Sequence, residues 1–287
     1  MHAKTELARF LRARRERVRP EEVGLPVTGR RRVPGLRREE LALLAGISAE
    51  YYLRLEQGRD RNPSATVLDA LARVLLLDDE ATAYLHALAG PGPRRRPRRP
   101  RPESVPSGIH QLVMSHPDAP AFVHGRYTDV LIANPLARAL SPCYTPGTNL
   151  LRAAFLDPQF RELHQDWEST ARSFVASVRA LAGPECEDPR LTELVGELAV
   201  RSQEFRRLWA RHDVRVRTSG VTCLDHPQVG PLRLGFEKLA LIGTDQVLVV
   251  HHALSRSESA QALTLLATLV APDPVPAGTS RTGAPDG

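Results

Sequence analysis

One short segment of the chain, residues 38–58, combines a regular apolar pattern with polar side chains on the opposite face. It reads REELALLAGISAEYYLRLEQG. The pattern predicts two short helices, in which small Ala42 allows close approach and Gly46 makes the turn between them. The side chains expected to fill their shared core are Ile47, Tyr52 and Leu55. This arrangement is typical of a helix-turn-helix, whose second helix reads the edges of DNA bases.

The second predicted helix carries the groups for such contacts. Ser48 can cap its first turn. The residues on or beside its outer face are Ala49, Glu50, Leu53, Arg54 and Gln57. We expect Ser48, Ala49, Glu50, Arg54 and Gln57 to lie at the DNA. Glu50 and Arg54 are the residues expected to contact bases.

Arginines on both sides of this segment are candidates for phosphate contacts. They are Arg30, Arg31, Arg32, Arg37, Arg38, Arg59 and Arg61. We expect the last four of these to bind phosphates, so that DNA binding weakens steeply as salt rises. The alternative is an ordinary helical hairpin whose arginines are solvated surface charges.

Charge is distributed unevenly along the chain. Residues 1–102 contain 22 Lys and Arg against 13 Asp and Glu, a balance of +9, whereas the remainder contains 17 against 20, a balance of −3. A basic half favours a polyanionic partner, and 287 residues are more than one compact domain usually needs.

Composition divides the chain into four parts. We expect a DNA-binding domain over 1–90, an Arg/Pro linker over 91–104, a second domain over 105–271 and a disordered tail over 272–287. The linker region reads GPGPRRRPRRPRPESVP, in which closely spaced Pro prevents helices and ladders. The tail is rich in Pro and Gly and has no apolar periodicity.

Apolar periodicity predicts a helical first domain and a mixed second domain. Helices are expected over residues 5–17 with Thr5 as the cap, 38–45, 49–57, 64–75 and 79–89. In the second domain we expect a hairpin over 121–124 and 129–134, helices within 135–212, strands over 214–218, 232–236, 239–242 and 247–253, and a helix over 257–269. Strands at both ends with helices between them predict an α+β domain with a largely antiparallel sheet.

Cysteine usage and hydropathy indicate the compartment. Cys143, Cys186 and Cys223 are widely spaced and form neither a disulfide framework nor a zinc-finger pattern. The sequence has no signal peptide and no run of 18 apolar residues. We therefore expect a soluble cytoplasmic protein with no metal, no cofactor and no membrane association.

Motifs of common catalytic sites are absent from the sequence. There is no G-x-S-x-G elbow, Walker A loop, G-x-G-x-x-G turn after a strand, or H-E-x-x-H helix. Adjacent His251 and His252 in a strand would face opposite ways, which argues against a shared metal. The remaining candidates for a catalytic group are Asp213, His226, Ser219 and Cys223. We favour a protein that is not an enzyme.

The segment 36–75 closely resembles a known family. With RREELALLAGISAEYYLRLEQGR and PSATVLDALARVL, it is similar to the Xre/Cro-type helix-turn-helix of actinobacterial regulators, in the extended form typical of MmyB-like regulators. The resemblance continues in PAFVHGRYTDVLIANPLARAL, NLLRAAFLDP, DWE, SQEFRRLWARHDV and DHPQVGPLRLGFEKLAL. It implies a multidomain protein, with an all-α, lambda-repressor-like domain followed by an α+β PAS-like domain. Members of the group have been associated with fatty acid-like ligands.

A fatty acid-like ligand needs an apolar cavity with a few polar groups at one end. Candidates to line it are Leu131, Ile132, Leu150, Leu151, Phe155, Phe174, Leu208 and Trp209, and candidates to hold a carboxylate are Asn134, Asn149 and Arg152. We therefore predict ligand contacts at Asn134, Asn149, Arg152, Phe155 and Trp209. The family usually has an aromatic residue before the Asn that matches Asn134, where this chain has Ala133, and this difference bears on the shape of the pocket.

Each of these candidates has a structural alternative. Trp209 can pack in the core, and Arg152 can lie at the surface or in an ion pair. Asn134 and Asn149 can cap the helices that follow them.

Together these features predict a sequence-specific transcriptional regulator that binds a double-stranded DNA operator. Its second domain is expected to sense a small apolar or fatty acid-like ligand, and the alternative is that this domain binds a protein partner. Because one recognition helix reads few base pairs and palindromic operators mirror two-fold symmetry, we expect a homodimer.

Overall fold

The computed structural model describes residues 2–26, 35–60, 63–90, 103–182, 188–215 and 217–270. Its N-terminal part is helical, with α1 (His2–Arg15), a 3-10 helix η1 (Pro20–Val23), α2 (Arg38–Ala45), α3 (Ala49–Glu56), α4 (Ala65–Val74) and α5 (Asp79–Ala89). The helices predicted at 38–45 and 79–89 are confirmed with the same bounds. Thr5 lies inside α1 instead of capping it, because nothing in the preceding residues breaks a helix.

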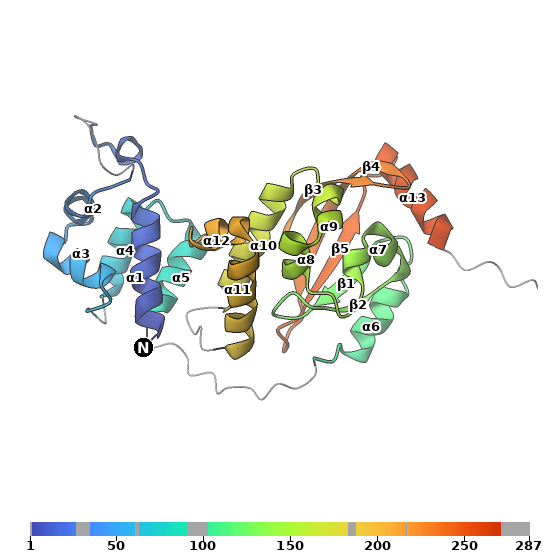
Figure 1. Ribbon diagram of the computed structural model, residues 1–287, viewed down its shortest axis with the longest axis horizontal. Coiled ribbons are helices and arrows are strands. Elements are labelled where there is room, and N and C mark those ends of the chain that lie inside the picture. The colour runs from blue at the N-terminus through green and yellow to red at the C-terminus, as the bar shows by residue number, and fades with distance from the viewer. Residues whose placement is uncertain are drawn as a thin grey trace, which may run out of the picture.

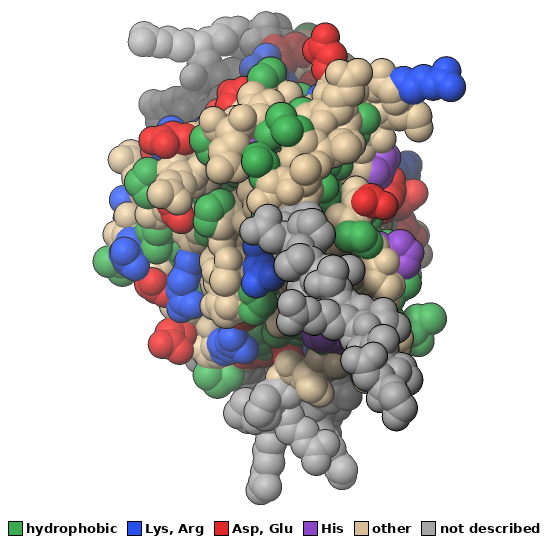
Figure 2. Space-filling view, turned by 90° about the vertical axis from the view of Figure 1, so that its right-hand side faces the viewer, with side chains coloured by type: hydrophobic (Ala, Val, Ile, Leu, Met, Phe, Trp, Pro, Cys, Tyr) green, Lys and Arg blue, Asp and Glu red, His purple; other side chains and the backbone are tan. Residues whose placement is uncertain are grey.

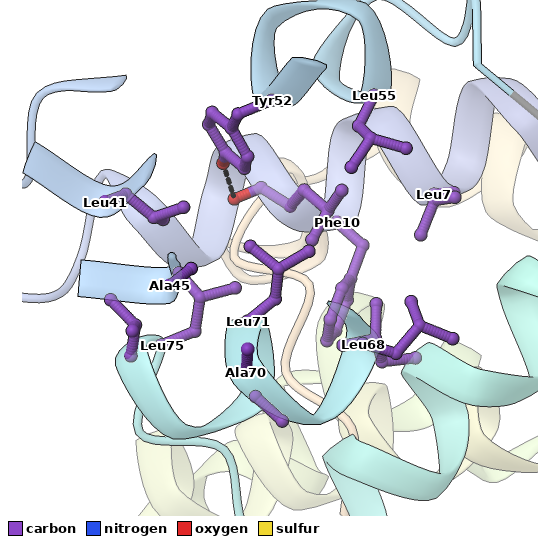
Figure 3. Packing of buried hydrophobic residues seen from close by; sticks show 14 of the residues in the cluster. Leu7, Phe10, Leu41, Ala45, Tyr52, Leu55, Leu68, Ala70, Leu71 and Leu75 are labelled. Carbon is purple, nitrogen blue, oxygen red and sulfur yellow. Dashed lines mark hydrogen bonds between the residues drawn. The ribbon is translucent and has the colours of Figure 1, made fainter. Parts of the chain in front are cut away.

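The apolar faces of these helices meet in one core. Phe10 and Leu11 of α1, Leu41 of α2, Leu55 of α3 and Leu71 of α4 are fully buried in it. Figure 3 shows Tyr52 of α3 reaching across this core, where its hydroxyl donates a hydrogen bond to the backbone oxygen of Leu11 at 3.5 Å. The core therefore holds α2 and α3 against α1, and the remaining side of α3 faces outward.

The C-terminal part contains a five-stranded antiparallel sheet. Its strands are β1 (Ala121–His124), β2 (Val130–Ala133), β3 (Ser219–His226), β4 (Gly230–Ala240) and β5 (Val247–His252), in the spatial order β2-β1-β5-β4-β3. The predicted α+β class with an antiparallel sheet is confirmed.

Helices surround this sheet. They are α6 (Ser107–Met114), α7 (Pro135–Leu140), η2 (Pro142–Tyr144), α8 (Leu150–Leu156), α9 (Pro158–Leu163), α10 (Trp167–Ala182), α11 (Pro189–Arg201), α12 (Gln203–Trp209) and α13 (Glu258–Val270). One apolar cluster joins α7, α8, α9 and α13 to one face of the sheet, which we call the inner face. A smaller cluster joins α6 to the opposite face. Helices α10–α12 lie between the sheet and the N-terminal helices (Figure 1).

The observed strands differ from the predicted ones in three ways. The expected strand at 214–218 is absent from the described residues of that range, because Val214 packs into the core of the N-terminal helices. Strand β3 follows at Ser219 and was not predicted, since its apolar alternation is weak. The two strands expected at 232–236 and 239–242 form the single strand β4, which continues through Glu237 and Lys238.

Several predicted features lie outside the described residues. They are the linker residues 91–102, residue 271 at the end of the predicted second domain, the tail 272–287, Arg30, Arg31, Arg32, Arg61 and Cys186. The end of the expected linker is described, and the backbone oxygen of Ser104 accepts a hydrogen bond from Gln246 at 3.1 Å. None of the described helices is long and apolar enough to cross a membrane.

Candidate nucleic-acid interface and ligand-binding region

The turn between α2 and α3 is fixed by two residues. Gly46 ends α2 in the left-handed conformation, with φ of +68°, which side chains with a Cβ rarely adopt. Ser48 caps the start of α3, where its hydroxyl oxygen accepts a hydrogen bond from the backbone nitrogen of Tyr51 at 3.1 Å. The backbone nitrogen of Ile47 also donates to the oxygen of Ala42 at 3.0 Å. These bonds define the angle at which α3 leaves the turn.

The predicted DNA-reading side chains share the outward face of α3. Ser48, Ala49, Glu50, Arg54 and Gln57 are exposed, as is Arg59 just beyond the helix. The Arg54 guanidinium is 3.5 Å from the Glu50 carboxylate, 3.7 Å from that of Asp60 and 5.5 Å from the centre of the Tyr51 ring. The exposed groups therefore combine donors and acceptors within one turn of helix, as reading base edges requires.

Behind this face lies a buried ion-pair cluster that the sequence did not reveal. The Glu56 side chain is only 2% exposed, and its carboxylate accepts hydrogen bonds from Arg15 at 2.5 Å and from Arg38 at 2.7 Å. Burial would raise the pKa of Glu56, but these hydrogen bonds outweigh it and hold the pKa below its ordinary value. The sequence did contain a signal for this position. Glu56 lies four residues after buried Tyr52, and this spacing places it on the core-facing side of the helix.

The predicted phosphate-binding arginines differ in their surroundings. Arg37 is exposed at the start of α2, and its backbone nitrogen donates to Glu40 at 2.7 Å. Arg38 is 44% exposed although it pairs with Glu56, so it bridges the buried cluster and the surface.

Asn134 and Asn149 cap helices, as the structural alternative held. The Asn134 side-chain oxygen accepts from Ala137 at 2.8 Å, and its nitrogen donates to the backbone oxygen of Ala119 at 2.7 Å. The Asn149 side-chain oxygen accepts from the backbone nitrogen of Arg152 at 2.9 Å, and its side-chain nitrogen donates to the backbone oxygen of Tyr127 at 2.7 Å. Both side chains are buried and have partners at oxygen and nitrogen.

Of the other predicted ligand contacts, Arg152 pairs with Glu197 at 2.8 Å and is 44% exposed. Phe155 meets the Phe205 ring edge-on, with ring centres 5.2 Å apart. Trp209 stacks on Phe205 at 5.6 Å, and the Arg179 guanidinium lies 3.9 Å from the centre of its ring. Phe155 and Trp209 thus belong to one aromatic cluster among α8, α10 and α12.

The expected apolar lining residues do not all lie together. Phe155 and Phe174 contact both the cluster at the inner face and the cluster among α8, α10, α11 and α12. Leu151 and Leu208 also belong to the helical cluster. Leu131 and Ile132 instead pack with α6 on the other face of the sheet. The described apolar interior near Phe155 is therefore formed by helices and the inner face.

The inner face also carries nitrogen-containing side chains that were not predicted as ligand contacts, of which His124 and His251 are buried and Lys238 is partly buried. Burial lowers the pKa of His124 to about 4 and that of His251 to about 3. Lys238 lies on the same face, and burial lowers its pKa to about 8. The two adjacent histidines face opposite ways as predicted, since His251 is 4% exposed and the His252 side chain is 50% exposed.

The candidate catalytic residues have separate partners. Asp213 accepts hydrogen bonds from Arg14 at 3.3 Å, from Arg211 at 3.1 Å and also from Arg17. His226 instead contacts the backbone oxygen of Ala139 at 3.0 Å. In the described part of the chain, no three His, Cys, Asp or Glu residues are grouped so that they could hold a metal ion.

Asp213 also connects the two parts of the chain. Its partners Arg14 and Arg17 belong to the N-terminal part, and Arg179 of α10 pairs with Glu6 of α1 at 3.5 Å. The described surface at the α13 and β4 end of the molecule carries basic and acidic side chains intermixed with apolar ones (Figure 2).

Comparisons with known proteins agree with this division. Residues 105–266 match the family described as "MmyB-like transcription regulator ligand binding domain", and residues 6–85 match a "Helix-turn-helix domain". A search of curated proteins found no match. A solved structure described as "Structure of an RNA-binding Light-Oxygen-Voltage Receptor" is 14% identical with a TM-score of 0.24, and the similarity covers 80% of this chain and 62% of that one.

That TM-score is too low to support an argument about fold or function. The family match carries the assignment, because it spans more than half of the 287 residues and begins after the helix-turn-helix described above. The predicted family is confirmed, and the chain belongs to the MmyB-like transcription regulators.

Proposed function

We propose that this protein controls transcription by sequence-specific binding to a double-stranded DNA operator, and that its C-terminal domain senses a small apolar or fatty acid-like ligand. The observation that carries the first part is the exposed face of α3, with Glu50 and Arg54 within one turn of a capped helix. Glu50 and Arg54 contact bases, together with Ser48, Ala49 and Gln57. Arg37, Arg38, Arg59 and Arg61 bind phosphates.

The domain layout of the proposal is 1–90 for the DNA-binding domain, 91–104 for the linker, 105–271 for the ligand-binding domain and 272–287 for the tail. The protein acts as a cytoplasmic homodimer, because a palindromic operator needs two recognition helices related by a two-fold axis. The C-terminal domain performs no catalysis, and its PAS-like architecture follows from the family resemblance.

Contacts between the domains support coupling of the ligand site to DNA. Trp209 stacks on Phe205 in the aromatic cluster, and its backbone oxygen accepts a hydrogen bond from Arg179 at 2.7 Å. Arg179 in turn pairs with Glu6 of α1. A ligand that moves α10 or α12 therefore acts on a helix that packs directly against α3.

Selection from a random DNA library, followed by affinity measurements on the selected operator and on random DNA, tests the DNA-binding part. Arg54→Ala should reduce operator affinity by about 1–3 kcal/mol and leave affinity for random DNA nearly unchanged. Arg38→Ala should weaken both by a similar factor and flatten the salt dependence. Equal losses on both DNAs for Arg54→Ala would reject its base-reading role.

Native mass spectrometry of the full chain purified from its own host tests the sensing part. A stoichiometric apolar metabolite that is released on denaturation supports the proposal, as does a dimer mass. A copurified protein bound to the C-terminal domain in place of a metabolite would overturn the small-molecule assignment in favour of a protein partner.

A further inference from the structure

Lys238 is chemically unusual in this chain. The sequence contains 39 Lys and Arg, of which only Lys4 and Lys238 are lysines. Strand β4 alternates Leu232, Leu234, Phe236 and Lys238 on one side, and the two leucines belong to the apolar cluster at the inner face. A cation thus occupies a position where the pattern calls for an apolar residue, and this is the position at which the sequence suggested a break in the strand.

The Lys238 ammonium is placed among aromatic rings. Its Nζ is 5.8 Å from the centre of the Phe174 ring of α10 and 5.5 Å from that of Phe236. Such contacts stabilise a cation only partly in the absence of a counter-ion. Phe174 also contacts the helical cluster that contains Phe155 and Trp209, so Lys238 lies at one end of the apolar region assigned to the ligand.

No carboxylate balances this charge within the residues that the structure describes. The charged group that acts on Lys238 is Arg217 before β3, and the titratable groups around it on the inner face are His251 on β5 and His124 on β1. One step further out, His164 and His252 lie by His251, and the Asp129 carboxylate, which pairs with Arg190 at 2.8 Å, acts on His124. Among the described residues, no carboxylate acts on Lys238 itself. Burial and the Arg217 charge together lower the pKa of Lys238 to about 8, which shows that its surroundings disfavour the charged form.

His251 adds an unused polar group to the same face. It is directly opposite Phe236 in the pairing of β4 with β5, and its ring stacks on Tyr144 with centres 5.7 Å apart. Its Nδ1 atom is buried without a hydrogen-bond partner. A buried polar atom without a partner is costly, and a ligand that supplies one removes that cost.

We infer that Lys238 and His251 form the head-group end of the ligand site, and that the ligand is an acid whose carboxylate or phosphate oxygens pair with Lys238 Nζ. This inference rests on the proposed function, since it concerns the small ligand of the C-terminal domain. The apolar body of the ligand lies along Phe174 and the helical cluster. Arg152, one of the carboxylate-binding candidates from the sequence, already pairs with Glu197, whereas no carboxylate among the described residues pairs with Lys238, so the ligand supplies its counter-charge.

Because the cation is a lysine, the affinity of the site for an acid should depend on pH. A partly buried, desolvated ammonium can lose its proton, which a guanidinium cannot do. The bound acid raises the pKa of Lys238 again, so an acid must bind together with a proton once the free site is neutral. Affinity for an acid should therefore fall by about tenfold per pH unit above pH 8, whereas affinity for a neutral analogue should stay constant.

The test uses the full-length delipidated protein and three probes that share a twelve-carbon chain: dodecanoate, dodecyl phosphate and methyl dodecanoate. Calorimetric titration at pH 7 should show that wild type prefers at least one acid over the ester by about tenfold or more. Lys238→Met should abolish that preference and leave ester affinity unchanged. Lys4→Met, at the other lysine, should bind all three probes like wild type.

The outcomes separate this inference from the proposed function. If Lys238→Met keeps the wild-type preference for the acid, or if acid affinity is flat from pH 7 to pH 9, the inference is overturned while a small-ligand sensor stands. If none of the probes binds wild type, the apolar-ligand assignment fails as well. The tighter of the two acids identifies the head group as carboxylate or phosphate. Unchanged ester binding by Lys238→Met also confirms that this variant is folded.

Discussion

At the scale of single residues, the carboxylate of Glu56 links α3 to both α1 and α2. It accepts hydrogen bonds from Arg15, whose side chain is 6% exposed, and from Arg38. Glu56→Gln removes the charge and leaves the Arg15 guanidinium buried without its counter-ion. Removal of one partner of a buried pair is strongly destabilising. Urea unfolding of the full chain should therefore show that the free energy of unfolding falls by about 3 kcal/mol.

The same residue predicts a pH dependence of stability. Because the pKa of Glu56 in the folded chain lies below its ordinary value of 4.5, the carboxylate contributes stability above that pH and loses it as pH falls through the lower, folded value. The stability gap between wild type and Glu56→Gln should therefore narrow below about pH 4.5. Glu39→Gln, at an exposed site on α2, should change stability by less than about 0.5 kcal/mol. A gap that is constant with pH would show that Glu56 acts through packing alone.

At the scale of elements, the turn from α2 to α3 depends on the left-handed conformation of Gly46. A Cβ at this position meets nothing within 4 Å, so Gly46→Ala introduces backbone strain without a clash. The free energy of unfolding, measured in urea, should fall by about 1 kcal/mol. Gly46→Asn should cost less, because Asn tolerates this conformation. Gly108→Ala in α6 is the control, since helical Gly108 has no such requirement and alanine there should stabilise. Equal stability of the Ala and Asn variants at position 46 would contradict this account.

The elements also show what the sequence could predict. Helices α2 and α5 were located residue by residue, because their caps and apolar spacing are local signals. Strand β4 was divided in two because inward-facing Lys238 interrupts the apolar alternation, and the reason for that lysine lies on other elements. Val214 has the character of a strand residue, but it is buried in the core of the N-terminal helices, which lie far earlier in the chain. Such long-range packing overrides local propensity.

The same distinction applies to the candidate sites. The outward face of α3 follows from i, i+3, i+4 spacing within one helix, so Glu50 and Arg54 could be placed from the sequence. A ligand-binding interior instead depends on which side chains several elements bring together. The sequence indicated that Asn134 and Asn149 could cap the helices that follow them. It did not show that the backbone oxygens of Ala119 and Tyr127, earlier in the chain, accept hydrogen bonds from their side-chain nitrogens.

At the scale of the whole molecule, Asp213 joins the two domains electrostatically. Its carboxylate accepts hydrogen bonds from Arg14 at 3.3 Å, from Arg17 and from Arg211, and it is largely buried. Burial and the neighbouring Arg17 charge lower the pKa of Arg14, although the Asp213 charge opposes this effect. Three cations therefore share one carboxylate where the ligand-binding domain contacts α1 and the residues just after it.

Asp213→Asn should loosen this contact between the domains. Without the negative charge, the three arginines repel one another, so the free energy that holds the two domains together should fall by about 2 kcal/mol. Hydrogen exchange should then become faster in α1 and around residues 211–215, and the radius of gyration in X-ray scattering should increase. Asp118→Asn, at an exposed site of the same domain, should change neither quantity. Unchanged exchange in α1 of the Asp213 variant would mean that Glu6 with Arg179 and the packing of Val214 hold the domains together without it, and signal transfer would then have to pass through α10.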